Sequence, residues 1–269
     1  MALGAPRMTA ALAAALALAG PAAAGPRVMS LDSCADQYVL ALSPPASIVG
    51  VSGRADDPDS YLRQRARGVP VRRATAESVL AARPDVVVRY WGGDARLQAA
   101  LVRRGVRVVR IDEAGDFGAV RGNVRRVAAA LDNRAGGEAL IAGMDRKLAA
   151  GRNAWGGAPA LYFTPTGYTT GPGTLVDAIL RGAGLVNTTR GAAWEPVALE
   201  SLVLAPPARF VLGFFDAFTT AMGRWGPGRH AALRKRLPGR TIAVLPASVL
   251  GCPAWFAADG VETLARARR

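Results

Sequence analysis

The sequence contains little cysteine, histidine or lysine, and these shortages exclude several classes of protein. Two cysteines among 269 residues are too few for a disulfide-rich scaffold or a cysteine-rich metal cluster. The single histidine, His230, excludes a zinc site built from several histidines and leaves one candidate for a Ser-His-Asp triad. Its place after Pro227-Gly228-Arg229 favours a capping or surface role at the start of a helix.

The net charge is strongly positive, but it does not indicate a nucleic acid partner. A net charge of +14 would ordinarily suggest nucleic acid or an anionic membrane. Only Lys147 and Lys235 are lysines, however, and the arginines are scattered along a chain rich in Ala, Gly and Pro. A biased base composition of the source genome explains this pattern, so we expect no nucleic acid partner. With 51% hydrophobic and 20% charged residues, the chain has enough apolar side chains for one large or two ordinary domains.

Residues 1–24 have the pattern of a secretory signal peptide. Arg7 supplies the positive charge, residues 8–19 form an apolar run too short to cross a bilayer, and Ala22-Ala23-Ala24 is a cleavage site. A helical anchor that stays attached is the alternative. No other segment approaches 18 unbroken apolar residues. We therefore expect a soluble, exported chain that begins near Gly25.

The rest of the chain alternates β-rich runs with helical stretches, twice over. In a first lobe, residues 25–116, we predict strands at 27–31, 47–51, 69–72, 85–89 and 106–111, and helices at 35–42, 76–82 and 95–104. In a second lobe, residues 152–269, we predict strands at 160–163, 209–212 and 241–245, and helices at 175–181, 199–204, 229–236 and about 255–266. Between them, residues 117–151 carry a helical repeat and predict one long helix, or two that abut at a bend near Gly136 and Gly137. This order is typical of two doubly wound α/β lobes with mainly parallel sheets.

An internal repeat supports two similar lobes. The segment from Glu77 to Val88 aligns without gaps on the segment from Glu200 to Val211. Each copy predicts a short helix carrying Glu-Ser, then a proline turn and a buried strand. A chance match between two common units is the alternative, and the paired Glu-Ser favours duplication or convergence on one design.

The order of signal peptide, lobe, long helix and lobe resembles periplasmic substrate-binding proteins whose lobes are joined by one rigid helix. Arg27-Val28-Met29-Ser30-Leu31, the segment from Glu77 to Val88, Tyr90-Trp91-Gly92-Gly93, and Trp194 before Glu200 are similar to the vitamin B12, haem and ferric-siderophore binders of ABC importers. The resemblance covers nearly the whole mature chain. It implies a monomeric periplasmic protein that captures a metal chelate in a cleft between its lobes and delivers it to the importer's membrane subunits. It implies no catalytic residue, cofactor or metal site of the protein's own.

Loops that follow strands form the ligand clefts of open α/β sheets, and large rings suit a macrocycle or an aromatic chelate. The expected ligand-binding residues are Tyr90, Trp91, Gly92, Gly93, Tyr168, Trp194, Phe215, Trp255 and Phe256. Packing of individual rings in the core is the alternative. Arg54, Arg89 and Arg190 are either partners of an anionic ligand or solvated surface residues.

Two further pairs of residues have one member in each lobe. Glu77 and Glu200 match the family's docking glutamates, and the resemblance implies that they meet arginines on the two membrane subunits. The alternative is that both are ordinary acidic residues, favoured near a helix N-terminus by the helix dipole. For Cys34 and Cys252 the sequence leaves three alternatives open: a disulfide that links the two lobes, two thiols that ligate a soft metal, or two free or buried cysteines. Because each lobe can build an adequate core, we expect no bridge that is essential for folding.

An exported α/β enzyme, a hydrolase or a chelate-modifying enzyme with the same cleft, is the main alternative function. The sequence gives it little support, because Asp36, Asp216 and Asp259 are isolated and no nucleophile elbow, Walker loop or dinucleotide fingerprint follows a strand. Gly171-Pro172-Gly173-Thr174 before a helix could hold an anion. A third possibility is a basic protein that binds envelope polymers through its arginines.

Overall fold

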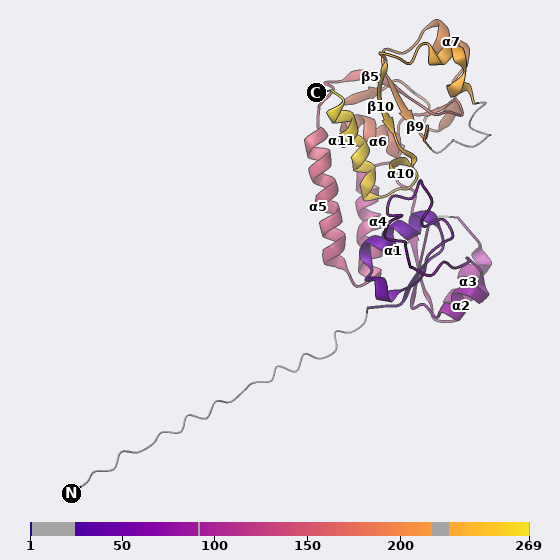
Figure 1. Ribbon diagram of the computed structural model, residues 1–269, viewed down its shortest axis with the longest axis vertical. Helices are drawn as coiled ribbons and strands as arrows, with labels where there is room; N and C mark the ends of the chain where they lie inside the picture. Colours follow the sequence, from indigo (N-terminus) through magenta and orange to yellow (C-terminus); the bar gives the residue numbers. More distant parts are fainter. Residues whose placement is uncertain (2–24, 91, 217–225, 269) are drawn as a thin grey trace.

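The computed structural model describes Met1 and residues 25–90, 92–216 and 226–268; most of the expected signal peptide and Trp91 lie outside the described residues. The chain forms two lobes, one above the other along the long axis, with a helix running beside both (Figure 1). Each lobe contains a four-stranded parallel sheet covered by helices. The expectation of two α/β lobes with parallel sheets is confirmed.

The N-terminal lobe has the strand order β2-β1-β3-β4. Its elements are β1 Val28–Ser30, α1 Ser33–Leu42, η1 Pro45–Ser47, β2 Ile48–Gly50, α2 Ala76–Ala82, β3 Val86–Tyr90, α3 Ala95–Arg103 and β4 Arg107–Ile111. Helix α1 begins two residues before the predicted start, because the Asp32 carboxylate caps it and accepts hydrogen bonds from the backbone N–H groups of Cys34 and Ala35. The predicted strand at 69–72 is reduced to one bridge between Val51 and Val71, since Pro70 has no N–H to offer to a ladder.

The C-terminal lobe has the strand order β10-β9-β5-β7, and a separate antiparallel pair, β6 with β8. Its elements are β5 Ala158–Phe163, β6 Tyr168–Thr170, α6 Leu175–Gly182, β7 Leu185–Asn187, β8 Trp194–Pro196, α7 Leu199–Leu204, β9 Phe210–Gly213, η2 Pro227–Arg229, α9 Ala231–Arg234, β10 Thr241–Leu245, α10 Ala247–Leu250, η3 Trp255–Ala257 and α11 Ala258–Arg266. The repeat is visible here, because α2 with β3 in one lobe corresponds to α7 with β9 in the other.

The connection between the lobes is two helices, where the sequence predicts one long helix or two abutting ones. Helix α4, Phe117–Ala130, packs along α5, Arg134–Gly151, and α5 extends beside both lobes (Figure 1). The break lies before the expected glycines, at Asp132, whose φ of 55° is left-handed and ends α4. Asn133 then caps α5 and donates to the carbonyl of Leu42 in the N-terminal lobe. A Cβ on Gly137 would lie 2.5 Å from the Ala128 Cβ, so this glycine lets the two helices approach closely.

One hydrophobic core runs through both lobes. The same cluster contains Tyr38 and Val88 of the N-terminal lobe, Val124 of α4, and Ile179 and Phe256 of the C-terminal lobe. Two smaller clusters fill the opposite sheet faces, one under α2 and α3 and one under α7 and α9. The lobes are therefore packed against each other as parts of one folded unit.

Candidate ligand-binding cleft

A cleft of about 290 Å³ lies where the two lobes face each other. The N-terminal lobe contributes Tyr90, at the end of β3, and the segment 113–115 after β4. The C-terminal lobe contributes the start of α6, the segment 192–194 and the segment 250–253 after α10. Because the strands of each sheet are parallel, their carboxyl ends meet at this edge, where ligands of open α/β sheets bind.

Tyr90 is held in position at the floor of this cleft. Its backbone N–H donates to the Asp32 carboxylate at 2.7 Å, and its hydroxyl donates to the carboxylate of Glu113. Glu113 is exposed, and sequence reasoning missed it because a single acid after a strand has no distinctive pattern. The phenol and the carboxylate give the cleft a pair of oxygen atoms.

Trp194 forms part of the opposite wall. It lies in β8, pairs with Thr170 of β6, and is 50% exposed, with its ring edge-on to Tyr162 at 6.0 Å between centroids. The same tryptophan borders a second cavity of about 270 Å³, which is also lined by Tyr168 and Phe214. Tyr168 is 43% exposed. The β6–β8 pair therefore presents two of the expected rings, Tyr168 and Trp194, to open space beside the cleft.

Gly92 and Gly93 follow β3, as expected, and both have left-handed φ values, of 82° and 79°. Gly93 lines a third cavity next to the cleft, together with Tyr90 and Arg89. The position of Trp91, the remaining member of this loop, lies outside the described residues.

Three of the expected rings lie away from the cleft, which corrects our placement of them. Phe256 is 1% exposed and stacks on Tyr61 with 4.2 Å between ring centroids. Trp255 is half-buried, edge-on to Tyr38, and Phe215 packs against the core of the C-terminal lobe. The short helix η3 carries Trp255 and Phe256 to the junction of the lobes, where their apolar area fills the shared core.

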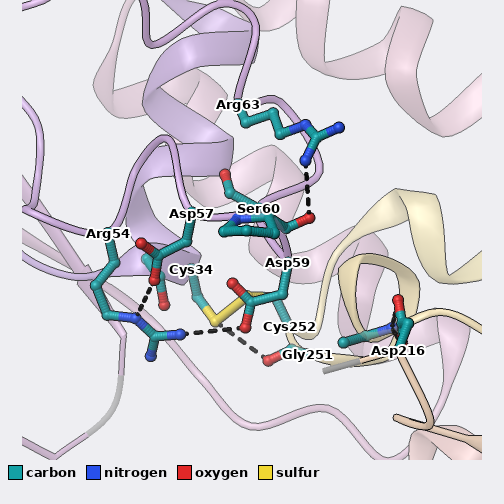
Figure 2. Close-up of polar contacts among 12 residues, drawn as sticks. Cys34, Arg54, Asp57, Asp59, Ser60, Arg63, Asp216, Gly251 and Cys252 are labelled. Atoms are coloured by element: carbon teal, nitrogen blue, oxygen red, sulfur yellow. Dashed lines mark hydrogen bonds and ion pairs between the residues drawn. A yellow bond between two sulfur atoms is a disulfide. The ribbon is translucent and has the colours of Figure 1, made fainter. Parts of the chain in front are cut away.

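Cys34 and Cys252 form a disulfide, with 5.4 Å between their Cα atoms (Figure 2). Neither is a free thiol, so the interpretations of free cysteines and of a soft-metal ligand pair are wrong. Cys34 lies in α1 of the N-terminal lobe, and Cys252 follows α10 and borders the cleft. The sequence left this pairing open because residues 218 positions apart meet only through the tertiary fold.

Arg54 and Cys252 both line a small cavity of about 90 Å³. The guanidinium of Arg54 is bound between Asp57, at 2.8 Å, and Asp59, at 3.1 Å (Figure 2). These carboxylates offset the charge of Arg54, so its position is explained without an anionic ligand. Arg190 is exposed and lines none of the cavities described here.

Asp36 is a buried carboxylate that the sequence marked only as isolated. It accepts hydrogen bonds from the hydroxyls of Ser30 and Ser52 and from the backbone N–H of Ser52 at 2.9 Å. Burial raises the pKa of Asp36 above its usual value, against the opposing effect of these hydrogen bonds. The carboxylate fixes α1 to β1 and to the loop after β2, below the cleft. His230 caps α9 through its Nδ1, as predicted, and is exposed.

Glu77 and Glu200 are both exposed, in the first turns of α2 and α7. No ion pair holds either carboxylate among the described residues. Figure 1 shows α2 and α7 in different lobes, near opposite ends of the long axis and on the side away from α5. Each side chain therefore faces solvent, outside the cleft.

The comparisons with known proteins agree on one family. A model of the periplasmic binding protein family matches residues 28–211, more than half of the chain. No curated protein sequence matches it at a significant level. Among solved structures, the periplasmic heme-binding protein BhuT in complex with two hemes is 26% identical, with a TM-score of 0.66 over 91% of this chain and 99% of that one.

Two further structures share the fold at lower identity. The periplasmic vitamin B12 binding protein BtuF of Vibrio cholerae is 16% identical, with a TM-score of 0.61 over 91% of this chain and 97% of that one. An ABC-type Fe3+-hydroxamate transport system protein from Saccharomonospora viridis is 20% identical, with a TM-score of 0.64 over 90% of this chain and 93% of that one. The chain therefore belongs to the periplasmic binding protein family, and it is a binding protein and not an enzyme.

Proposed function

We propose that this protein captures a metal chelate, a haem, a ferric siderophore or a corrinoid, in the cleft between its lobes. The observation that supports this most directly is the position of the cleft, at the facing carboxyl ends of two parallel sheets, with Trp194 exposed on its wall. Exposed rings bind flat or macrocyclic ligands through a large contact area at a low cost in side-chain entropy. Solved structures of the same fold include a heme-binding protein, a vitamin B12 binding protein and a protein of an Fe3+-hydroxamate transport system.

The polar groups of the cleft favour a ferric chelate as the first ligand to test. The side-chain oxygens of Tyr90 and Glu113 line the cleft. The sulfur atom of Cys252, which also borders the cleft, belongs to a disulfide, and His230 caps α9 and is not among the lining residues. Oxygen donors match ferric iron better than they match a soft metal. The relative at 26% identity holds two hemes, which makes haem the leading candidate within this class.

We propose further that the protein works in the periplasm, after removal of residues 1–24, as a monomer that delivers its ligand to the membrane subunits of an ABC importer. None of the described helices is long and apolar enough to cross a membrane. In this proposal, residues 25–116 and 152–269 act as the two lobes and residues 117–151 as their connection. Glu77 and Glu200 would dock the two lobes on two equivalent membrane subunits.

Purification from the native host, followed by an absorption spectrum, tests the proposal directly, since haem, corrinoids and ferric siderophores absorb visibly and differently. Titration of the emptied protein with haemin, cyanocobalamin and ferrichrome should give tight stoichiometric binding of one of them, without turnover. Failure to bind any of the three would contradict the proposal. If the protein instead bound polyanions with an affinity that falls steeply as the salt concentration rises, the result would favour the alternative of a basic protein that binds envelope polymers.

A further inference from the structure

Arg89 is an arginine buried inside a sheet. It is the fourth residue of β3, an interior strand of the N-terminal lobe, and its side chain is on the face covered by α2 and α3. On the same face, two residues earlier, Val87 packs into the apolar cluster with Leu97 and Leu101. Arg89 is only 5% exposed. Burying a guanidinium is unfavourable unless an acceptor or an anion compensates its charge.

No such partner is present in the part of the chain that the structure describes. The guanidinium of Arg89 makes no hydrogen bond or ion pair there. Two carboxylates, Asp32 and Asp94, border the same cavity, but neither forms an ion pair with it. Asp32 accepts from the backbone N–H groups of Cys34, Ala35 and Tyr90, and Asp94 accepts from the N–H of Arg96 at 2.7 Å.

Both carboxylates are therefore committed to helix caps. Asp32 caps α1 and Asp94 caps α3, so each lies against the positive end of a helix dipole that offsets part of its charge. Among the described residues around this cavity, no group forms an ion pair or a hydrogen bond with the Arg89 guanidinium, so its charge is not neutralised by direct contact.

The guanidinium faces a cavity of about 230 Å³ at the carboxyl edge of the sheet. Tyr90 lines this cavity and also the cleft between the lobes, so the two spaces adjoin. A Cβ on Gly93 would lie 3.0 Å from the Arg89 Nη2, which shows that the loop passes directly over the charged group. Leu31, Ala74 and Leu97 give the cavity apolar walls. A short apolar arm ending in a small anion fits this combination.

We infer that the Arg89 cavity is a subsite for an oxyanion, a carboxylate or a phosphate, carried by the ligand in the main cleft. The planar guanidinium offers a fork of N–H donors that matches either group with two parallel hydrogen bonds. The inference deepens the proposed function, because it adds a charge requirement to the chelate. The oxyanion site itself depends only on Arg89 and the residues around it.

Inorganic phosphate tests the site without any chelate. The melting temperature of the whole protein is measured in phosphate and in chloride at equal ionic strength, for the wild type, Arg89→Gln and Arg107→Gln. Arg107 lies exposed on β4 of the same lobe, so the control removes the same charge from an open surface. We expect phosphate, at several times its dissociation constant, to raise the melting temperature of the wild type and of Arg107→Gln by about 2–4 °C. The shift should vanish in Arg89→Gln, and an equal shift in all three proteins would overturn the inference.

Matched chelates then identify the source of the anion. Haemin is compared with its dimethyl ester for a carboxylate, and cobalamin with cobinamide, which lacks the phosphate together with the attached ribose and benzimidazole, for a phosphate. The wild type should prefer the charged member of one pair by about 10- to 100-fold, and this preference should disappear in Arg89→Gln but not in Arg107→Gln. A phosphate shift that depends on Arg89, in a protein that binds none of these chelates, would uphold the oxyanion site and reject the proposed function. If the wild type bound the charged and the uncharged member of a pair with equal affinity, the anion of that chelate would not reach Arg89, and the inference would be wrong.

Discussion

Cys34 of the N-terminal lobe is covalently bonded to Cys252 of the C-terminal lobe. One turn further along α1, the hydroxyl of Tyr38 donates to the carbonyl of Pro253 at 2.6 Å, so the helix is tied twice to the same loop. In the loop between β2 and α2, Tyr61 donates to the Asp259 carboxylate of α11 at 2.7 Å, and Lys147 of α5 pairs with the same carboxylate. The two lobes are thus joined by covalent, polar and apolar contacts. These contacts oppose a wide hinge motion of one lobe against the other.

Reduction of the disulfide should lower stability without unfolding the protein. A bridge between such distant residues restricts the unfolded chain, and we expect a loss of about 2–4 kcal/mol in the free energy of unfolding. The shared core and the contacts of Tyr38 and Asp259 remain, so the reduced protein should keep one cooperative transition. Thermal unfolding with and without reductant measures this effect, with Cys34→Ser/Cys252→Ser as a control that reductant should not change. A reduced protein that is unfolded at 25 °C would show that the bridge is essential after all.

Gly115 should be intolerant of any side chain, because it lies against the backbone of the other lobe. A Cβ built on Gly115 would lie 2.3 Å from the carbonyl oxygen of Gly173. Gly115→Ala should therefore force the lobes apart and cost about 1–3 kcal/mol of stability. Gly122 is a matched control, since it lies exposed in the middle of α4 with nothing within 4 Å of its Cβ position. Gly122→Ala should stabilise the protein by about 0.5–1 kcal/mol, and equal effects of the two substitutions would argue against a tight junction.

The sequence predicted the repeated architecture because its signals are local. Buried strands such as β3 contain continuous apolar runs, and the Glu-Ser helices before β3 and β9 are both short, with seven and six residues. The cap at Asp32 and the cap at His230 were also readable from neighbouring residues. These features depend on contacts within a few positions of the chain, which a single sequence contains.

The rest of the site depends on contacts between distant segments. The strands β6 and β8 are short and mostly polar. No alternation of apolar residues therefore predicts the strand pair that carries Tyr168 and Trp194. The burial of Phe256 results from packing against Tyr61, almost 200 positions away, and the break at Asp132 from a single left-handed residue. For Arg89 the sequence leaves a ligand partner and a surface arginine both open, because only the three-dimensional sheet shows that its side chain is enclosed.

Trp194 should contribute directly to ligand affinity. Its ring is half exposed and borders both the cleft and the adjoining cavity, so Trp194→Ala removes contact area while the core stays intact. We expect binding of the chelate to weaken by about 1–3 kcal/mol, with little change in melting temperature. Trp155→Phe is the control, since Trp155 donates to the Leu264 carbonyl away from the cleft and should affect stability and not affinity. Unchanged affinity in Trp194→Ala would exclude this ring from the site. The same loss is expected for Trp91→Ala.

The last prediction separates delivery from binding. Glu77 and Glu200 occupy the same point of the same helix-and-strand unit in the two lobes, and both are exposed. A membrane partner with two-fold symmetry would offer each lobe the same kind of contact. Charges at the rim of an interface chiefly set the rate and orientation of association. Glu77→Arg with Glu200→Arg should therefore abolish uptake in cells, because each new cation would face a like charge on the importer.

Ligand affinity of the purified double variant should stay near that of the wild type, because neither glutamate lines any of the four cavities described above. Isothermal titration with the chelate and growth dependent on that chelate measure the two effects separately. Glu138→Arg with Glu262→Arg is the control, since it makes the same change in net charge on α5 and α11 and breaks only surface ion pairs. Normal uptake by the Glu77→Arg/Glu200→Arg variant would reject docking through Glu77 and Glu200. An equal loss of uptake in this variant and in the control variant would reject it as well. A loss of affinity in the first pair would instead mean that these helices contribute to the ligand site.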